Sequence, residues 1–442
     1  MQSMQNIIPL LPMLKALETC DTIRCKGIVT NVSGLLVESR GPNVSVGDIC
    51  WITSRGDHQK KAAQVVGIRG HKILLMPFED TTGIGTGCEV ESARQPMYIG
   101  VGSSLLGRVI DGFNRPIDGK GPVQDLSPVY IYRDPPPALS RPRITQPLTS
   151  GIRAIDSLVT CGEGQRVGIF AGSGVGKSVL LGMIARNSSA DVNVIALIGE
   201  RGREVREFIE RDLGEEGLKK SVVVVVTSDQ AAVLRIRGAL IATTIAEYFR
   251  DQGKNVVLMM DSVTRVAMAQ REVGLAIGEP PTTKGYTPSV YAFLPKLLER
   301  SGMSAKGTIT GFYTVLVEGD DMSDPVADTV RSILDGHLVL SRKLASKNHY
   351  PAIDVLNSVS RVMVDIVDKE HHALAAKARE VLSTFEEAED LINIGAYVRG
   401  NNPAIDYALR YIEKVRLHLR QGIFEKSDFM ASKQSLKNIF LN

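Results

Sequence analysis

The sequence predicts an α/β protein in which a central parallel sheet carries a glycine-rich loop, with a β-barrel before it and a helical domain after it. Short β-type runs crowd residues 24–92, apolar strands alternate with helical patterns over residues 147–365, and two long helical patterns follow residue 369. The expected divisions are 1–22 for an N-terminal docking segment, 23–95 for the barrel, 96–365 for the central domain and 366–442 for the helical domain.

Composition indicates a globular protein of a reducing compartment. The 442 residues are 43% hydrophobic and 23% charged, and the formal net charge of +3 indicates neither nucleic acid nor a membrane surface as a partner. The cysteines are scattered and lack histidines at zinc-ligand spacing, so we expect buried free thiols at Cys20, Cys25, Cys50, Cys88 and Cys161. No apolar run is long enough to span a bilayer and no secretory leader is evident, which predicts a cytoplasmic protein.

Residues 4–17 form an apolar stretch near the N-terminus, and Pro9 and Pro12 interrupt it. Because proline is tolerated in the first turn of a helix and not in its interior, a short helix is expected to begin near Pro12. This segment either docks on a partner or a membrane surface, or packs on the domain behind it.

Residues 24–92 are expected to form a small barrel or sandwich. Their β-type runs are separated by Gly, Asn and Asp, and residues 27–32 show alternation of apolar and polar side chains. Basic residues interleaved with aromatic ones, which mark barrels that bind nucleic acid, are missing, and Trp51 is the only tryptophan. A scaffold or oligomerisation barrel is therefore favoured, and nucleic acid is not expected as a partner.

The central domain follows irregular chain, rich in Gly and Pro, at 107–122 and 134–147. Its strand candidates are 167–170, 192–198, 221–227, 255–260, 309–317 and 337–340. Helical patterns, such as the one at 232–250, lie between most of them. Apolar strands that alternate with helices predict a parallel sheet that is covered on both faces, with ligands at the carboxyl ends of the strands.

A glycine-rich loop between a strand candidate and an apolar-periodic helix is the clearest functional signal. Its glycines let successive backbone N–H groups point at phosphate oxygens, and the helix adds its positive N-terminal end. Lys177 supplies a charge for the β- and γ-phosphates, and Ser178 supplies a hydroxyl for magnesium. Ala171 stands where the motif ordinarily begins with glycine. The predicted nucleotide-binding residues of this loop are Ala171, Gly172, Ser173, Gly174, Val175, Gly176, Lys177, Ser178 and Val179.

Acidic residues at two strand ends complete the predicted site. Asp261 ends an apolar strand and is expected to hold magnesium through water, as phosphoryl-transfer sites require. Glu200 ends another apolar strand and is placed to orient or polarise the water that attacks the γ-phosphorus. Arg201, beside it, is placed to contact γ-phosphate oxygens. The alternative is that Glu200, Arg201, Arg203 and Glu204 only pair with one another on a solvated helix start.

Six stretches along the chain resemble the ATPases of type III export systems, which are similar to the catalytic subunit of rotary ATP synthases. In order, they are AGSGVGKS, GERGRE, LMMDSVTR, AIGEPPTTKGYTPSVY, VEGDDMSDPVADTVRSILDGHLVLSR and HYPAIDVLNSVSR. Within that family the flagellar export ATPase is the expected member, and the virulence injectisome ATPase is the alternative. The resemblance implies a RecA-like ATPase domain and a homo-hexamer with ATP and Mg²⁺ at each subunit interface. It makes Lys177 and Glu200 catalytic and Asp261 the Walker B acid.

The resemblance also implies that neighbouring subunits share each site. Tyr350 matches the residue whose ring stacks on adenine, the alternative being a core tyrosine beside Pro351. Arg361 matches the arginine finger that reaches the neighbouring subunit's site, so a lone subunit is expected to be a poor catalyst. Either Ile423 or Phe424 would close the adenine pocket.

The segment from residue 369 to the end is helix-rich, with Gly395, Gly400 and Pro403 between its two patterns. His371 and His372 are adjacent, so a solvated helix start is expected there and a metal site is not. By resemblance, this domain faces the membrane export gate and engages chaperone–cargo complexes, and the protein works with stator, regulator and stalk proteins at the inner face of the cytoplasmic membrane. A catalytic subunit of an ion-translocating rotary ATPase and a non-catalytic ring subunit are the other function classes; Glu200 disfavours the second of these.

Overall fold

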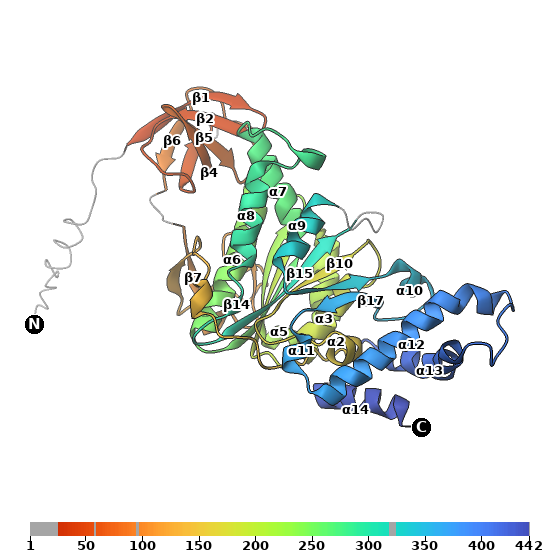
Figure 1. The fold of residues 1–442 in the computed structure, drawn as a ribbon. Coiled ribbons are helices and arrows are strands. Elements are labelled where there is room, and N and C mark those ends of the chain that lie inside the picture. Colours follow the sequence, from red (N-terminus) through yellow and green to blue (C-terminus); the bar gives the residue numbers. More distant parts are fainter. Residues whose placement is uncertain (1–24, 57–58, 94–96, 318–323, 442) are drawn as a thin grey trace, which may run out of the picture. The chain divides into compact units, whose positions relative to one another are not determined.

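The structure is a computed structural model, and it describes residues 25–56, 59–93, 97–317 and 324–441. The expected docking segment, the helix near Pro12 and Cys20 lie outside these residues. The chain divides into two compact units, 1–96 and 97–442, and each is described by itself (Figure 1).

The first unit holds a closed β-barrel whose strand order is β1-β2-β5-β4-β3-β6. Its strands are β1 (Lys26–Ser33), β2 (Leu36–Arg40), β3 (Ile49–Thr53), β4 (Lys60–Arg69), β5 (Lys72–Pro77) and β6 (Glu89–Ser92). In β3, Cys50 and Ile52 point inward and are fully buried, whereas Trp51 between them is exposed, as the period of two in a strand requires. The predicted barrel is confirmed.

The second unit is built on a mostly parallel sheet whose main path is β17-β16-β10-β15-β13-β11-β12-β8, with β14 paired to β15. The strands are β8 (Val109–Asp111), β10 (Arg166–Ala171), β11 (Val192–Glu200), β12 (Ser221–Thr227), β13 (Asn255–Asp261), β14 (Gly302–Met303), β15 (Thr308–Leu316), β16 (Gly336–Leu340) and β17 (Ile353–Ser360). Only β14 and β17 run antiparallel to their neighbours among these strands. A separate hairpin pairs β7 (Tyr98–Val101) with β9 (Ser127–Tyr130). Every predicted strand is present, and the predicted parallel sheet is confirmed.

Helices cover both faces of this sheet. On β11, the side chains of Ile195 and Leu197 join the core that also holds α3 (Lys177–Asn187). The side chain of Ile198 points the other way, toward α6 (Ala232–Asp251). A Cβ on Gly238 of α6 would lie 2.5 Å from Val226 and 2.9 Å from Ile198, so this glycine lets α6 lie directly on the sheet. The other helices of the sheet region are α2 (Arg153–Leu158), α4 (Gly202–Glu207), the π-helical turn Phe208–Leu213, α5 (Gly214–Lys219), α7 (Val263–Ala276), α8 (Pro288–Leu298), α9 (Pro325–Ile333), α10 (Arg342–Ser346) and α11 (Met363–Ile366).

Three helices form the C-terminal part of the second unit: α12 (Lys369–Asn393), α13 (Pro403–Leu419) and α14 (Phe429–Phe440). Gly395 and Gly400 adopt positive φ in the connection between α12 and α13, and the side chain of Asn402 caps α13. Their apolar faces join the same core as α3, through residues such as Ala378, Ile412 and Leu436. These helices are therefore packed on the sheet region, beside α2 (Figure 1).

The structure corrects three expectations from the sequence. The stretch 107–122 is not wholly irregular, because Val109–Asp111 forms β8 and extends the sheet beside β12. A bidentate ion pair between Arg108 and Asp118, with an Nε–Oδ2 distance of 2.7 Å, joins the two halves of this stretch, which folds back on itself beside β8. His371 is buried, not solvated, since its Nε2 lies 2.8 Å from the carbonyl oxygen of Ser157. Cys25 is exposed, whereas the other three described thiols are buried and free as expected.

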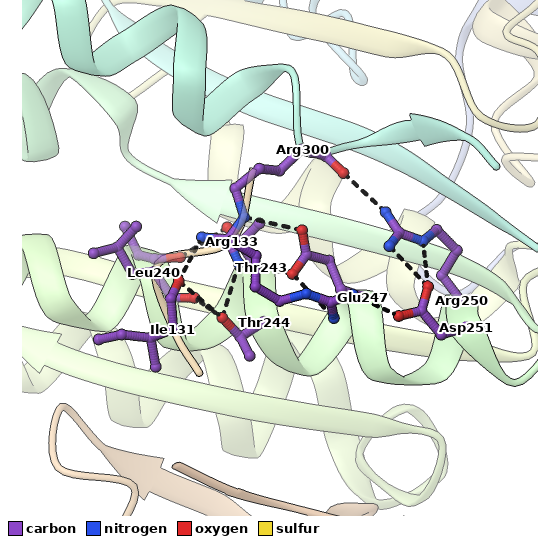
Figure 2. A network of polar contacts seen from close by, with 10 residues as sticks. Ile131, Arg133, Leu240, Thr243, Thr244, Glu247, Arg250, Asp251 and Arg300 are labelled. Carbon is purple, nitrogen blue, oxygen red and sulfur yellow. Dashed lines mark hydrogen bonds and ion pairs between the residues drawn. The ribbon is translucent and has the colours of Figure 1, made fainter. Parts of the chain in front are cut away.

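A buried polar network holds the chain after β9 against α6 (Figure 2). Arg300, 2% exposed, makes a bidentate ion pair with Glu247 at 2.9 and 2.7 Å and donates a hydrogen bond to the carbonyl oxygen of Ile131. Arg133 approaches the same carboxylate at 3.5 Å, and Arg250 donates to the carbonyl oxygen of Arg300. Removing one partner of a buried pair leaves an unpaired charge and costs about 3–5 kcal/mol, so the network fixes this connection.

Candidate active site

The glycine-rich loop leaves the carboxyl end of β10 and ends where α3 begins. Gly174 and Gly176 have φ of +78° and +89°, values that side chains other than glycine rarely adopt, and Gly176 caps α3. Ala171 is still in β10, paired with Leu316 and Leu340, so its extended backbone does not need glycine. The loop therefore has the backbone that a phosphate cradle requires, and alanine fits at its first position.

Lys177 brings the two predicted carboxylates together. Its Nζ lies 2.5 Å from Oδ1 of Asp261 and 3.5 Å from Oε1 of Glu200. Asp261 is 3% exposed and also accepts a hydrogen bond of 2.7 Å from the hydroxyl of Thr314 on β15. Gly199, with φ of +74°, turns the end of β11 so that Glu200 faces this lysine. Three residues that are far apart in the sequence thus meet at the carboxyl edge of the sheet, as predicted.

The protonation of this cluster follows from its burial. Burial raises the pKa of Glu200 to about 7, and the negative charge of Asp261 adds to the effect, whereas Lys177 opposes it. Burial lowers the pKa of Lys177, but Asp261 and Glu200 outweigh this and raise it above its ordinary value. Lys177 therefore stays charged, and Glu200 gains and loses its proton near neutral pH, as a general base does.

The charged residues at the end of β11 and the start of α4 lie in two environments. Arg201 is 81% exposed at its side chain and lies 3.4 Å from Glu204, so the predicted pairing is right for these two residues. Arg203 instead pairs with Glu207, at 2.8 Å. Glu200 faces Lys177, and its side chain also shares a hydrogen bond with Glu204, which helps to raise the pKa of Glu200. Arg201 still lines the cleft in front of the phosphate loop.

This cleft has a volume of about 780 Å³, and its walls include residues that the sequence analysis did not single out. Arg265 projects into it from the first turn of α7, and its Nε is buried without a hydrogen-bond partner in the described chain. Arg342, at the start of α10, approaches the loop so closely that a Cβ on Gly172 would lie 2.7 Å from its Nη2. Both arginines lie within the stretches that carry the family resemblance. Arg265 comes four residues after Asp261, and this spacing is the signal that could have identified it.

A second pocket, of about 560 Å³, adjoins the cleft and shares Gly174, Gly176 and Val179 with it. Tyr350 lines it and is 41% exposed, so it is not a core tyrosine. The other walls are mainly apolar, and the volume is typical of pockets for small molecules. The remaining lining residues are Val175, Leu180, Met183, Leu340, Asn348, Pro351, Ala352, Arg420, Gln421, Gly422 and Ile423.

Ile423, not Phe424, lines this pocket. The ring of Phe424 is 74% exposed and lies under the guanidinium of Arg186, 5.3 Å from its centroid. The two pockets together can take a molecule with a polyanionic end and a flat apolar end, since one is lined by cations and glycines and the other by an aromatic ring.

Arg361 and the phosphate loop lie at opposite ends of the strands of the sheet. The backbone N–H of Arg361 donates to the carbonyl oxygen of Asp335. The backbone N–H of Asp335 in turn donates to the carbonyl oxygen of Arg166, at the start of β10. The loop leaves the other end of that strand, after Ala171, which is about 16 Å away at 3.3 Å per residue. Arg361 is exposed and does not line the cleft of its own chain.

The sequence matches known families along most of its length. Residues 151–360 match the nucleotide-binding domain of the ATP synthase alpha/beta family, and residues 29–93 match its beta-barrel domain. Residues 367–438 match the T3SS EscN ATPase C-terminal domain.

Individual proteins are similar over nearly the whole chain. The flagellum-specific ATP synthase of Bacillus subtilis (strain 168) is 56% identical over 93% of this chain and 94% of its own length. The SPI-2 type 3 secretion system ATPase of Salmonella typhimurium is 52% identical over 90% of each chain. The solved structure of the assembled ATPase EscN in complex with its central stalk EscO, from enteropathogenic E. coli, superimposes with a TM-score of 0.86 at 46% identity, covering 93% of this chain and 99% of that one.

Proposed function

The chain belongs to the type III export ATPases of the ATP synthase alpha/beta family, and from this premise we propose that it hydrolyses ATP for a flagellar export apparatus as a homo-hexamer. The meeting of Lys177, Glu200 and Asp261 in front of the phosphate loop carries the proposal. The flagellar relative from Bacillus subtilis is more similar than the secretion ATPase from Salmonella, which favours the flagellar role over the injectisome. The match of the C-terminal helices favours export over rotary ATP synthesis.

Several residues of the cleft and of the adjoining pocket have a part in the proposed reaction. The backbone N–H groups of residues 172–178 hold the phosphates, and Lys177 exchanges its carboxylate partners for β- and γ-phosphate oxygens. Glu200 orients and deprotonates the attacking water, while Arg201 contacts the γ-phosphate. Tyr350 and Ile423 receive the adenine. These roles account for a carboxylate with a raised pKa that lies beside a phosphate-binding lysine.

The residues around Lys177 also fit a magnesium ion. Ser178, in the first turn of α3, and the buried carboxylate of Asp261 supply hard oxygen ligands, and Mg²⁺ in such sites takes few protein ligands because phosphates and waters supply the rest. When bound, the ion neutralises charge on the β- and γ-phosphates.

The position of Arg361 supports a site that two subunits share. An exposed arginine on the far edge of the sheet cannot serve the cleft of its own chain, but in a head-to-tail ring the same surface faces a neighbour's cleft. We infer that it stabilises the charge that develops as the γ-phosphate leaves.

Partners and location follow from the family. A central stalk accompanies EscN in the solved structure, which supports a stalk protein as a partner. A stator or regulator, chaperone–cargo complexes and the membrane export gate are proposed as further partners from the resemblance. Hydrolysis would release or unfold cargo and deliver it to the gate, with the protein bound peripherally at the inner face of the cytoplasmic membrane. None of the helices in the described residues is long and apolar enough to cross a bilayer.

Hydrolysis should depend steeply on protein concentration. Because each site needs Arg361 from a neighbour, dilution below the assembly range is expected to lower the activity per subunit, and further subunit should restore it. The measurement is ATP turnover by the purified chain over a dilution series, with light scattering to follow assembly. Turnover per subunit that stays constant while the particles become monomers would contradict the shared site.

The pH dependence of ATP hydrolysis should follow the ionisation of the Glu200 carboxyl group. Its pKa of about 7 predicts that kcat/KM for magnesium-saturated ATP rises with pH and levels off above that value, because the protonated carboxyl cannot accept the proton of water. The same raised pKa means that the stabilising contribution of this group is present at low pH and is lost as the pH rises through 7. A profile whose acid limb lies below pH 5 would exclude this assignment.

A further inference from the structure

One wall of the adenine pocket is a loop that has no regular structure of its own. Residues 420–428 connect α13 to α14 and belong to no helix or strand, and Gln421, Gly422 and Ile423 of this C-terminal loop line the pocket. A single backbone hydrogen bond of 2.9 Å joins the N–H of Gln421 to the carbonyl oxygen of Tyr350 on the opposite wall. The loop must therefore be held by side chains from elsewhere.

Arg153, the first residue of α2, holds this loop. Its Nε donates to the carbonyl oxygen of His418 at 2.8 Å, its Nη2 donates to the carbonyl oxygen of Arg420, and its Nη1 pairs with the carboxylate of Glu425. The N–H of Arg153 donates to Oε1 of Gln421 at 2.9 Å. The side chain of Arg153 is only 15% exposed, and its bond to His418 is partly buried, whereas its bonds to Arg420 and Glu425 lie at the surface.

Gln421 completes the attachment. Its Nε2 donates to the carbonyl oxygen of Gly151, just before α2, at 2.8 Å, and to the carbonyl oxygen of Glu425 at 2.9 Å. The amide is buried and its bonds are directed into the protein. From the far side, Arg186 at the end of α3 donates to the carbonyl oxygen of Ile423 at 2.6 Å. The helix that begins at the phosphate loop and the helix that carries Arg153 thus both fix the pocket wall.

We propose that Arg153 is a positioning residue for nucleotide affinity: it pre-organises the C-terminal loop so that Ile423 and Gln421 stand opposite Tyr350 when the nucleoside arrives. This inference rests on the proposed function, because it assumes that the pocket receives the adenine. A wall that is already ordered costs no conformational entropy on binding, whereas a loose wall must be ordered at the expense of affinity. Arg153 does not touch the phosphate cleft, so its effect is confined to the nucleoside half of the substrate.

The test compares two ligands that share a phosphate chain. In Arg153→Met the side chain keeps its length and loses its hydrogen bonds. Isothermal titration calorimetry with Mg²⁺ is expected to give a Kd for ATP that is weaker by about tenfold, equivalent to about 1.4 kcal/mol, and an unchanged Kd for inorganic tripolyphosphate, which has no base. KM for ATP should rise in the same proportion, with kcat largely kept.

Arg379→Met is the matched control. Arg379 on α12 also ties the C-terminal helices to the sheet region, through hydrogen bonds of 3.0 and 3.1 Å to the carbonyl oxygens of Leu158 and Ser358, but it does not contact the C-terminal loop. This variant should keep both affinities. Glu425→Gln removes the carboxylate partner of Arg153 at an exposed position, and it should weaken ATP selectively, by less than Arg153→Met.

The outcomes separate the two levels of the proposal. Equal weakening of ATP and tripolyphosphate, the same loss in Arg379→Met, or unchanged ATP affinity in Arg153→Met would overturn the role of Arg153 and leave the proposed function intact. If Arg153→Met does not fold, Glu425→Gln decides, and unchanged ATP affinity in that variant would also overturn the role. An unmodified protein that binds tripolyphosphate and ATP equally would contradict the adenine pocket, and one that binds neither would contradict the proposed function as well.

Discussion

Replacing Glu200 by glutamine is expected to lower kcat for ATP by about 10² to 10⁴-fold, the usual effect of losing a general base. The glutamine amide has the same shape but cannot accept the proton of the attacking water. ATP binding should survive, because the phosphate loop, Lys177 and the adenine pocket are untouched, and loss of a buried carboxylate with a raised pKa relieves repulsion with Asp261.

Single-turnover hydrolysis and ATP binding by calorimetry measure the two effects separately. Glu207→Gln is the matched control, since Glu207 lies two turns further on, pairs with Arg203 on the surface and does not line the cleft. Turnover by Glu200→Gln within a few-fold of normal would remove Glu200 from the mechanism.

Replacing Arg361 by alanine is expected to lower kcat by about 10³-fold or more, the scale of arginine fingers in other nucleotidases. The residue lies at the start edge of β10 and not at the phosphate loop, so ATP binding to the same chain should be unchanged. Steady-state kinetics at a concentration that saturates assembly measure the loss. Arg206→Ala, which removes an exposed arginine paired with Glu210, is the control and should keep normal turnover.

The phosphate loop and its two carboxylates could be predicted because local sequence determines them. The loop is contiguous, its glycines occupy the positive-φ positions, and Glu200 and Asp261 each end an apolar strand. Parallel strands bring their carboxyl ends to one edge, so the meeting at Lys177 follows from the fold class alone.

Features that depend on contacts between distant segments could not be predicted in the same way. The burial of His371 depends on α2, more than 200 residues earlier, and β8 lies in a glycine-rich stretch that folds back on itself through contacts such as the ion pair between Arg108 and Asp118. Ile423, and not Phe424, lines the pocket beside Tyr350 because of how Arg153 and Arg186 hold the C-terminal loop. None of these contacts leaves a periodic or spaced pattern in the sequence.

The central claim is that ATP is split in a cleft to which neighbouring subunits contribute Lys177 and Arg361. The direct test mixes two inactive variants, Lys177→Ala and Arg361→Ala, as dissociated subunits and then allows them to assemble. In a ring with heterologous interfaces, about a quarter of the sites in a random equal mixture pair an intact Lys177 with a neighbour's intact Arg361, so turnover should recover toward that fraction of normal. Recovery of no activity, from mixed rings whose assembly is verified, would contradict the shared cleft.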